Sequence, residues 1–193
     1  MTPTWNSILN RHIARHLFEV TSRIKGAGST MGFVVEFSSD LILFHVVNSD
    51  TLKLNGYSVV REEDVEYYRA FDKRGFWQAQ VVQQLGLKPV RPNGILLSSL
   101  PDLLKSIGDR YALITIHPEK RKPDVCFIGP LLSLSKVTFT IDDLNSSAEW
   151  TGPRRIRYAD VTRVDFDGGY ERGLASVAPK RDSLKRNISP DPL

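Results

Sequence analysis

The alternation of apolar and polar positions predicts a chain built mainly from β-strands, with a few short helices between them. Apolar residues recur at steps of three and four from Trp5 to Leu17, which predicts an N-terminal helix with Pro3 in its first turn. The runs FVVEF and LILFHVV, joined at SSD, are typical of an antiparallel hairpin. Asn55-Gly56 marks another tight turn, from which YSVVR leads through the charged corner EED into VEYY. The first half is therefore expected to be a helix followed by about five strands.

The second half repeats this order of elements. FDKRGFWQAQVVQQLGLK predicts a helix that Gly86 ends, and KPVRPNG is the predicted linker. SSLPDLLKSIG predicts a short helix capped by Ser99, with Pro101 in its first turn and Gly108 at its end. Strands are expected in YALITIH, DVCFIG, KVTFTID, RRIRY and VTRVDF. Gly168 and the glycine that follows it are expected to end the last strand.

A short stretch of sequence is repeated in the two halves, at the corner before the last strand of each. Both copies read apolar, Arg, two variable positions, Asp, Val, two variable positions, apolar. The matched residues are Val60 with Ile156, Arg61 with Arg157, Asp64 with Asp160, Val65 with Val161, and Tyr68 with Val164. Duplication of one fold is the interpretation favoured by the order of elements, and coincidence in a strand-rich chain is the alternative.

A helix followed by a bent five-stranded antiparallel sheet resembles the Sm-like (LSm) small-barrel family. The repeated apolar-Arg stretch is similar to the second motif of that family, although Glu62 and Tyr158 stand where the family has glycine. The first motif is matched by Gly32, Val34, Phe37 and Leu41, whereas Ser38 replaces its aspartate and Ile42 its asparagine. The resemblance predicts a mainly β chain with short helices, forming two tandem Sm-like (SH3-like) five-stranded antiparallel barrels, each preceded by a helix.

Four segments follow from this prediction. They are a first Sm-like barrel with its N-terminal helix (residues 1–71), a helical connector and linker (72–98), a second barrel with its leading helix (99–175), and a basic flexible tail (176–193). The Sm-like family joins edge strands of neighbouring subunits, so the resemblance also implies self-association, within the chain as a pseudo-dimer or between chains. A protein–protein scaffold assembled through these strand edges is the second hypothesis for function.

RNA is the partner that the resemblance implies, with Arg61 and Arg157 carried over from the second motif. Serine and isoleucine in the first motif remove the hydrogen-bonding groups with which the family recognises a base. The net charge is +4, and the tail from Arg172 onward holds five basic and two acidic residues. Arg154, Arg155 and Tyr158 add positive charge and a stacking surface near the second corner. Solvated hairpin tips are the alternative interpretation of these basic groups.

No catalytic residue, metal site or cofactor is expected. His12 and His16 share a helix face, but no third ligand follows from spacing, and GAGSTMG lacks the lysine and the helix of a phosphate loop. Acidic residues cluster at both corners. The third hypothesis for function is an enzyme that uses these carboxylates in acid–base chemistry. The alternative is that they form salt bridges on a solvated surface. Asp64 and Asp160 are expected to accept backbone hydrogen bonds at the corners. The acidic residues concerned are Glu62, Glu63, Asp64, Glu66, Asp160, Asp165, Asp167 and Glu171.

Three further features predict a cytoplasmic protein with no membrane partner. No apolar run approaches the roughly 20 residues that cross a bilayer. The first residues lack the pattern of a secretion signal. The single cysteine, Cys126, cannot form an internal disulfide and is expected to be a buried packing residue.

Overall fold

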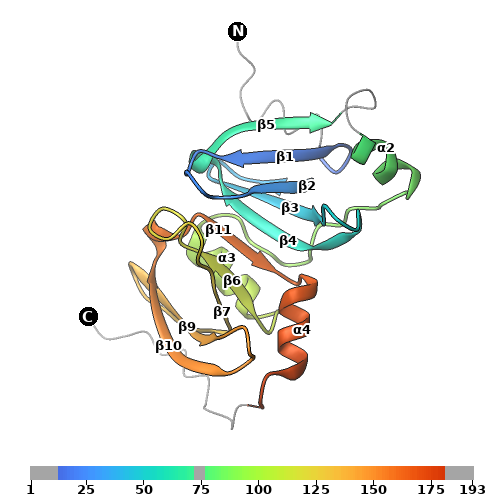
Figure 1. Cartoon of the computed structure of the whole chain (residues 1–193). Helices are drawn as coiled ribbons and strands as arrows, with labels where there is room; N and C mark the ends of the chain where they lie inside the picture. Colours follow the sequence, from blue (N-terminus) through green and yellow to red (C-terminus); the bar gives the residue numbers. More distant parts are fainter. Residues whose placement is uncertain (1–12, 72–76, 181–193) are drawn as a thin grey trace. The chain divides into compact units, whose positions relative to one another are not determined.

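The computed structural model of the chain describes residues 13–71 and 77–180. The chain divides into two compact units, residues 1–93 and residues 94–193, and the division falls within the predicted linker (Figure 1). Most of the predicted N-terminal helix, including Trp5 and His12, lies outside the described residues. Its predicted last residue, Leu17, is instead the first residue of a strand.

The first unit is a five-stranded antiparallel sheet in the order β5-β1-β2-β3-β4. The strands are β1 (Leu17–Ser22), β2 (Ser29–Phe37), β3 (Leu41–Val47), β4 (Leu54–Arg61) and β5 (Val65–Phe71). A 3-10 turn, η1 (Glu62–Asp64), joins β4 to β5, and the helix α2 (Trp77–Gln84) follows. Gly86 ends this helix with a positive φ of 61°, as the sequence predicted. A bulge between Val34 and Glu36 interrupts the ladder of β2 and β3.

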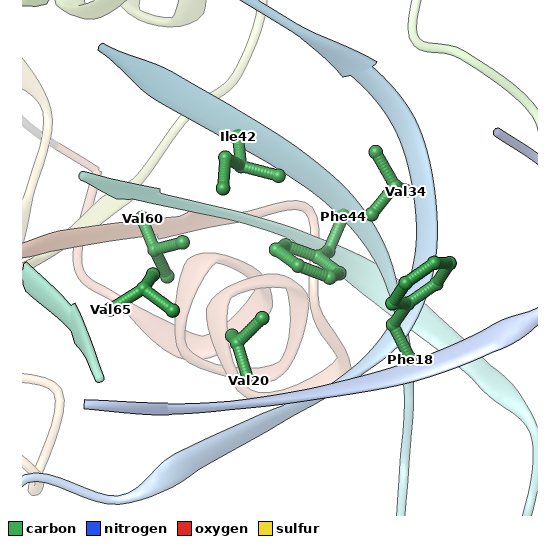
Figure 2. Close-up of a cluster of buried hydrophobic side chains, with 7 residues drawn as sticks. All are labelled: Phe18, Val20, Val34, Ile42, Phe44, Val60 and Val65. Atoms are coloured by element: carbon green, nitrogen blue, oxygen red, sulfur yellow. The ribbon is translucent and has the colours of Figure 1, made fainter. Parts of the chain in front are cut away.

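Two apolar clusters pack on the first unit's strands. Seven buried side chains, drawn in Figure 2, point toward one another between the curved strands: Phe18, Val20, Val34, Ile42, Phe44, Val60 and Val65. A second cluster forms where Val82 of α2 packs with Leu17, Phe33 and Phe71. Alternating residues such as Leu17 and Phe18 enter different clusters because successive side chains of a strand point to opposite faces. Apolar residues occur on both faces of these strands because the helix α2 covers the second face.

The second unit begins with a helix and contains six strands. Its elements are α3 (Leu100–Gly108), β6 (Ile114–His117), β7 (Phe127–Gly129), β8 (Leu131–Leu134), β9 (Thr138–Leu144), β10 (Trp150–Arg157), the 3-10 turn η2 (Tyr158–Asp160), β11 (Arg163–Phe166) and α4 (Gly169–Val177). Ser99 caps α3 by accepting a hydrogen bond from the Asp102 amide at 3.2 Å, which confirms the predicted cap. β6 lies between β11 and β7, and β9 lies between β8 and β10.

The strand order of the second unit corresponds to that of the first when β7 and β8 are taken together. Only Pro130 separates β7 from β8, and its carbonyl accepts a hydrogen bond from Asp142 of β9 at 3.1 Å. The order β11-β6-β7/β8-β9-β10 then parallels β5-β1-β2-β3-β4. Repetition of one chain path in both units therefore extends far beyond the short stretch of matched sequence.

The strand registers match every member of the first unit's inner cluster to an apolar residue of the second unit. For example, Phe18 faces Gly32 of β2, and Ile114 faces Gly129 of β7. The matched pairs are Phe18 with Ile114, Val20 with Ile116, Val34 with Leu131, Ile42 with Phe139, Phe44 with Ile141, Val60 with Ile156, and Val65 with Val161. All of these residues are buried except Leu131, which is half-buried. The same arrangement of inward apolar positions forms both cores.

The turns are repeated as well as the strands. The Ser38 amide donates to Leu41 at 2.8 Å, and the Ser135 amide donates to Thr138 at 2.8 Å. In both turns the serine hydroxyl also accepts a hydrogen bond from the backbone amide three residues later, from Leu41 at 3.2 Å and from Thr138 at 3.3 Å. Side-chain to backbone bonds of this kind fix short turns. The turns at Ser38 and Ser135 are thus both closed by a serine side chain.

The structure corrects several predictions while it confirms the mainly β, antiparallel class with short helices. The described strands of neither unit close into a barrel, so the prediction of two tandem five-stranded barrels is not confirmed. Gly168 does not merely end a strand, because it is the N-cap of α4, a helix that the sequence interpretation missed. The predicted tail from residue 176 begins inside α4, and residues 181–193 lie outside the described part.

Candidate nucleic-acid interface

The repeated Arg residues occupy equivalent corners of the two units. Arg61 ends β4 and Arg157 ends β10, and a three-residue 3-10 turn follows each. Their backbones are nearly the same, with φ and ψ of −77° and 134° at Arg61 and −84° and 140° at Arg157. Each arginine therefore has the extended backbone of a strand end. The two corners therefore allow a direct comparison of one site in two copies.

The second unit's corner holds two arginines around one carboxylate. Arg157 donates from Nε and Nη2 to the two oxygens of Asp160, at 3.0 Å and 2.8 Å. Arg121 approaches the same carboxylate at 3.4 Å. The hydrogen bonds from Arg157 lower the pKa of Asp160 and raise the pKa of Arg157. Within the described residues, the side chain of Asp160 accepts hydrogen bonds from arginines and not from backbone amides, so the predicted corner cap is wrong.

Tyr158 is fixed beside this corner. Its ring stacks on Phe139 with 5.4 Å between ring centres, and its hydroxyl donates to the Ser135 carbonyl at 3.2 Å. Partial burial raises the pKa of the Tyr158 hydroxyl. One side of the ring is thus committed to packing against the core. Because the Tyr158 ring is half-exposed, only its exposed part can stack on an RNA base.

Arg154 and Arg155 differ in their availability although they are neighbours on β10. Arg154 binds Asp143 at 2.7 Å and lies over the ring of Phe127, 4.2 Å from its centre. Arg155 is exposed and makes no side-chain hydrogen bond or ion pair within the described part of the chain. Because side chains alternate along a strand, Arg155 and Arg157 project from the same side of β10. Arg154 is consequently held by both a carboxylate and an aromatic ring, whereas Arg155 extends the charge of the Arg157 corner.

The equivalent corner of the first unit has a different character. The side chain of Arg61 is 21% exposed and lies 3.7 Å from Glu63, whereas the side chain of Arg157 is 58% exposed. Asp64 is buried. Asp40 and Glu62 are joined at this corner by a backbone hydrogen bond of 2.9 Å. Arg61 therefore lies beside the Glu63 carboxylate and is largely covered, whereas Arg157 is exposed and shares the Asp160 carboxylate with Arg121.

The predicted RNA-binding residues thus divide among three environments. Arg157 and Tyr158 meet at the second corner, Arg155 lies on the same strand, and Arg154 is occupied by its carboxylate and ring contacts. Arg61 belongs to the other unit. The sequence did not indicate that Arg121 lies with Arg157 at the Asp160 carboxylate. The contact of Arg121 with Asp160 depends on the conformation of the turn between β6 and β7, which the sequence pattern does not determine.

Two of the acidic residues considered for catalysis, Asp165 and Asp167, are held by basic partners. Asp165 accepts from His117 at 2.8 Å and lies 3.3 Å from Arg163. Asp167 lies 3.2 Å from Arg172 and has a positive φ of 56°, so it does not continue the strand face of Asp165. Salt-linked faces are therefore the better interpretation of these charges. Within the described residues, no group of three or more His, Cys, Asp or Glu side chains could hold a metal ion.

Cys126 is exposed, so the prediction of a buried packing residue is wrong. It precedes β7, and only the residues after it enter the sheet. Partial desolvation and the nearby Asp165 carboxylate raise the pKa of its thiol. A raised pKa reduces the thiolate fraction and makes the residue a poor nucleophile.

Comparison of the chain with models of protein families, with curated proteins and with solved structures finds no match. No helix in residues 13–71 and 77–180 is both long and apolar enough to cross a membrane.

Proposed function

We propose that the chain is a non-enzymatic RNA-binding protein made of two divergent Sm-like small-barrel units, in which the second unit's corner binds the RNA backbone. The observation that carries the proposal is the convergence of Arg157 and Arg121 on Asp160. The carboxylate reduces repulsion between the two guanidinium groups and orients them. Both remain more than half exposed, at 58% and 64% of their side-chain surface.

The contacts favour backbone binding over recognition of a particular base. Guanidinium groups match phosphate geometry, and their charge acts on any sequence. The serine of each first-motif turn is used to close that turn, as seen for Ser38 and Ser135. Tyr158 supplies one half-exposed ring. Weak sequence preference and strong salt dependence are therefore expected.

The test is binding of a labelled single-stranded RNA followed by fluorescence anisotropy. The double variant Arg121→Gln with Arg157→Gln should weaken binding at least tenfold, by about 1.4 kcal/mol or more. Arg61→Gln, the matched change at the other corner, should leave affinity within about twofold. Equal losses for both, or no RNA binding by the wild-type chain, would reject the proposal.

A scaffold that assembles through strand edges is the second candidate. β10 is an edge of the three-stranded sheet β10-β9-β8, and its backbone is available on one side within that sheet. Pro153 lies in the middle of β10 and removes one donor from the strand. Light scattering should detect a defined oligomer if this edge pairs with another chain, and replacing Thr151 with lysine should disrupt it. A monomer at all concentrations would exclude the scaffold.

A further inference from the structure

We infer that the first unit contains a binding site for a small carboxylic acid with an apolar, ring-sized body. The site is a cavity of about 230 Å³ between the beginning of β1, the end of β5 and the helix α2. A cavity of about 150 Å³ in a protein core accepts benzene, so this one has room for a bicyclic ring or a medium-length acyl chain. The inference goes beyond the proposed RNA binding and does not depend on it.

The walls of the cavity are apolar. They include Leu17, Phe33, Phe71, Val82 and Leu87. All five belong to the second apolar cluster of this unit, the one that contains Val82 of α2. Small residues, among them Ala79 on α2, create the space between these larger side chains. A pocket lined by aliphatic and aromatic groups binds the apolar part of a ligand.

The polar groups of the site lie at its opening. Arg15 and Gln83 both line the cavity and are both exposed, so their side chains are at the solvent side. Arg15 makes no hydrogen bond or ion pair with any residue in the part of the chain that the structure describes. An arginine at the mouth of an apolar cavity complements a carboxylate, which it can bind through two parallel hydrogen bonds. His16, which is half-buried, also lines the cavity. The ligand class follows from the combination of an apolar chamber with the Arg15 guanidinium at its mouth.

Isothermal titration of the full chain with indole-3-acetate and with its neutral counterpart indole-3-ethanol tests the inference. Indole-3-acetate should bind with a Kd of about 10–100 μM, in the range of small ligands of this size. Arg15→Gln should weaken the acetate about tenfold and leave the alcohol unchanged. Ala79→Leu, which fills the chamber, should abolish binding of both probes. Gln80→Leu, on the same helix but outside the cavity lining, is the matched control and should bind normally.

Amide and methyl NMR spectra of the wild-type chain locate the site without any variant. Addition of indole-3-acetate should shift the signals of Val82 and Leu87 and leave those of the second unit, such as Ile141, unchanged. Absence of binding by both probes would overturn the inference. Undiminished binding to a folded Ala79→Leu variant would overturn it as well, and so would equal binding of the acid and the alcohol to the wild-type chain. RNA affinity should be unchanged in these variants, so failure here is distinct from failure of the proposed function.

Discussion

Gly32 and Gly129 occupy the same position in the two units of the chain. Each faces a fully buried residue of its unit's first strand, Phe18 in one and Ile114 in the other. Each also lies against the backbone of the next strand. A Cβ at residue 32 would meet the His45 carbonyl oxygen at 2.5 Å, and a Cβ at residue 129 would collide with the Asp142 carbonyl oxygen. The strands cross too closely at this point for any side chain.

Alanine at either glycine should therefore destabilise its unit. We expect Gly32→Ala and Gly129→Ala each to lower the free energy of unfolding by about 1–3 kcal/mol, because backbone must move to admit the methyl group. Urea titration followed by circular dichroism measures the change. Gly173→Ala is the matched control, since a Cβ there meets nothing within 4 Å and the residue lies in α4. Helix propensity predicts that this variant is more stable by about 0.5–1 kcal/mol. Unchanged stability in both strand variants would contradict the close approach.

The Arg157–Asp160 pair makes a prediction about pH. Because the folded state lowers the pKa of Asp160 below its ordinary value of 3.8, the pair stabilises the fold above that pH. This contribution is lost as pH falls from 3.8 through the lowered pKa. Carboxyl NMR titration should show Asp160 titrating below 3.8 in the wild-type chain and closer to 3.8 in Arg157→Gln. An identical titration in both proteins would show that the arginine does not hold the carboxylate.

The segment after α2 is attached to the first unit's sheet by two side chains. Arg91 makes two hydrogen bonds to the Glu36 carboxylate, at 2.6 Å and 2.9 Å, and the Val90 amide donates to Nδ1 of His45 at 3.1 Å. Tyr57 stacks on the same imidazole with 4.5 Å between ring centres. These contacts fix the chain where the two units meet in sequence.

Removing the Glu36 charge should loosen this segment with little change in global stability. Glu36→Gln is expected to increase hydrogen exchange at the Val90 amide, because its neighbour Arg91 loses its partner. The free energy of unfolding should fall by less than about 1 kcal/mol, as is typical of exposed ion pairs. Exchange mass spectrometry gives the first quantity and urea titration the second. Glu66→Gln, an exposed change on β5, serves as the control, and equal exchange in all three proteins would contradict the attachment.

Sequence patterns predicted most strands and the α3 cap, because alternation and capping are local properties. The equivalence of Gly32 and Gly129 could not be predicted, since it depends on the strand registers on either side of Pro130. The helix α4 was missed because two glycines at its start favour a turn, although the structure uses Gly168 as an N-cap. Local signals fail where a residue's role is set by a distant strand.

The candidate site was predicted in part for the same reason. Matching sequence located Arg61 and Arg157 at equivalent corners, and the structure places both at strand ends. Their exposure could not be predicted, because it depends on side-chain neighbours. Asp160 holds Arg157 at the surface, whereas Arg61 is largely covered. Two copies of one sequence motif therefore differ in exposure because their neighbouring side chains differ.

The dependence of RNA affinity on salt is the most direct test of the claim that the second corner binds the RNA backbone. The slope of log K against log salt concentration should decrease in magnitude by about 1.4 when Arg121 and Arg157 are both replaced by glutamine, since about 0.7 is lost per phosphate contact with a single strand. Arg61→Gln should retain the wild-type slope. A wild-type slope in the double variant, or a loss caused by Arg61→Gln instead, would contradict the account.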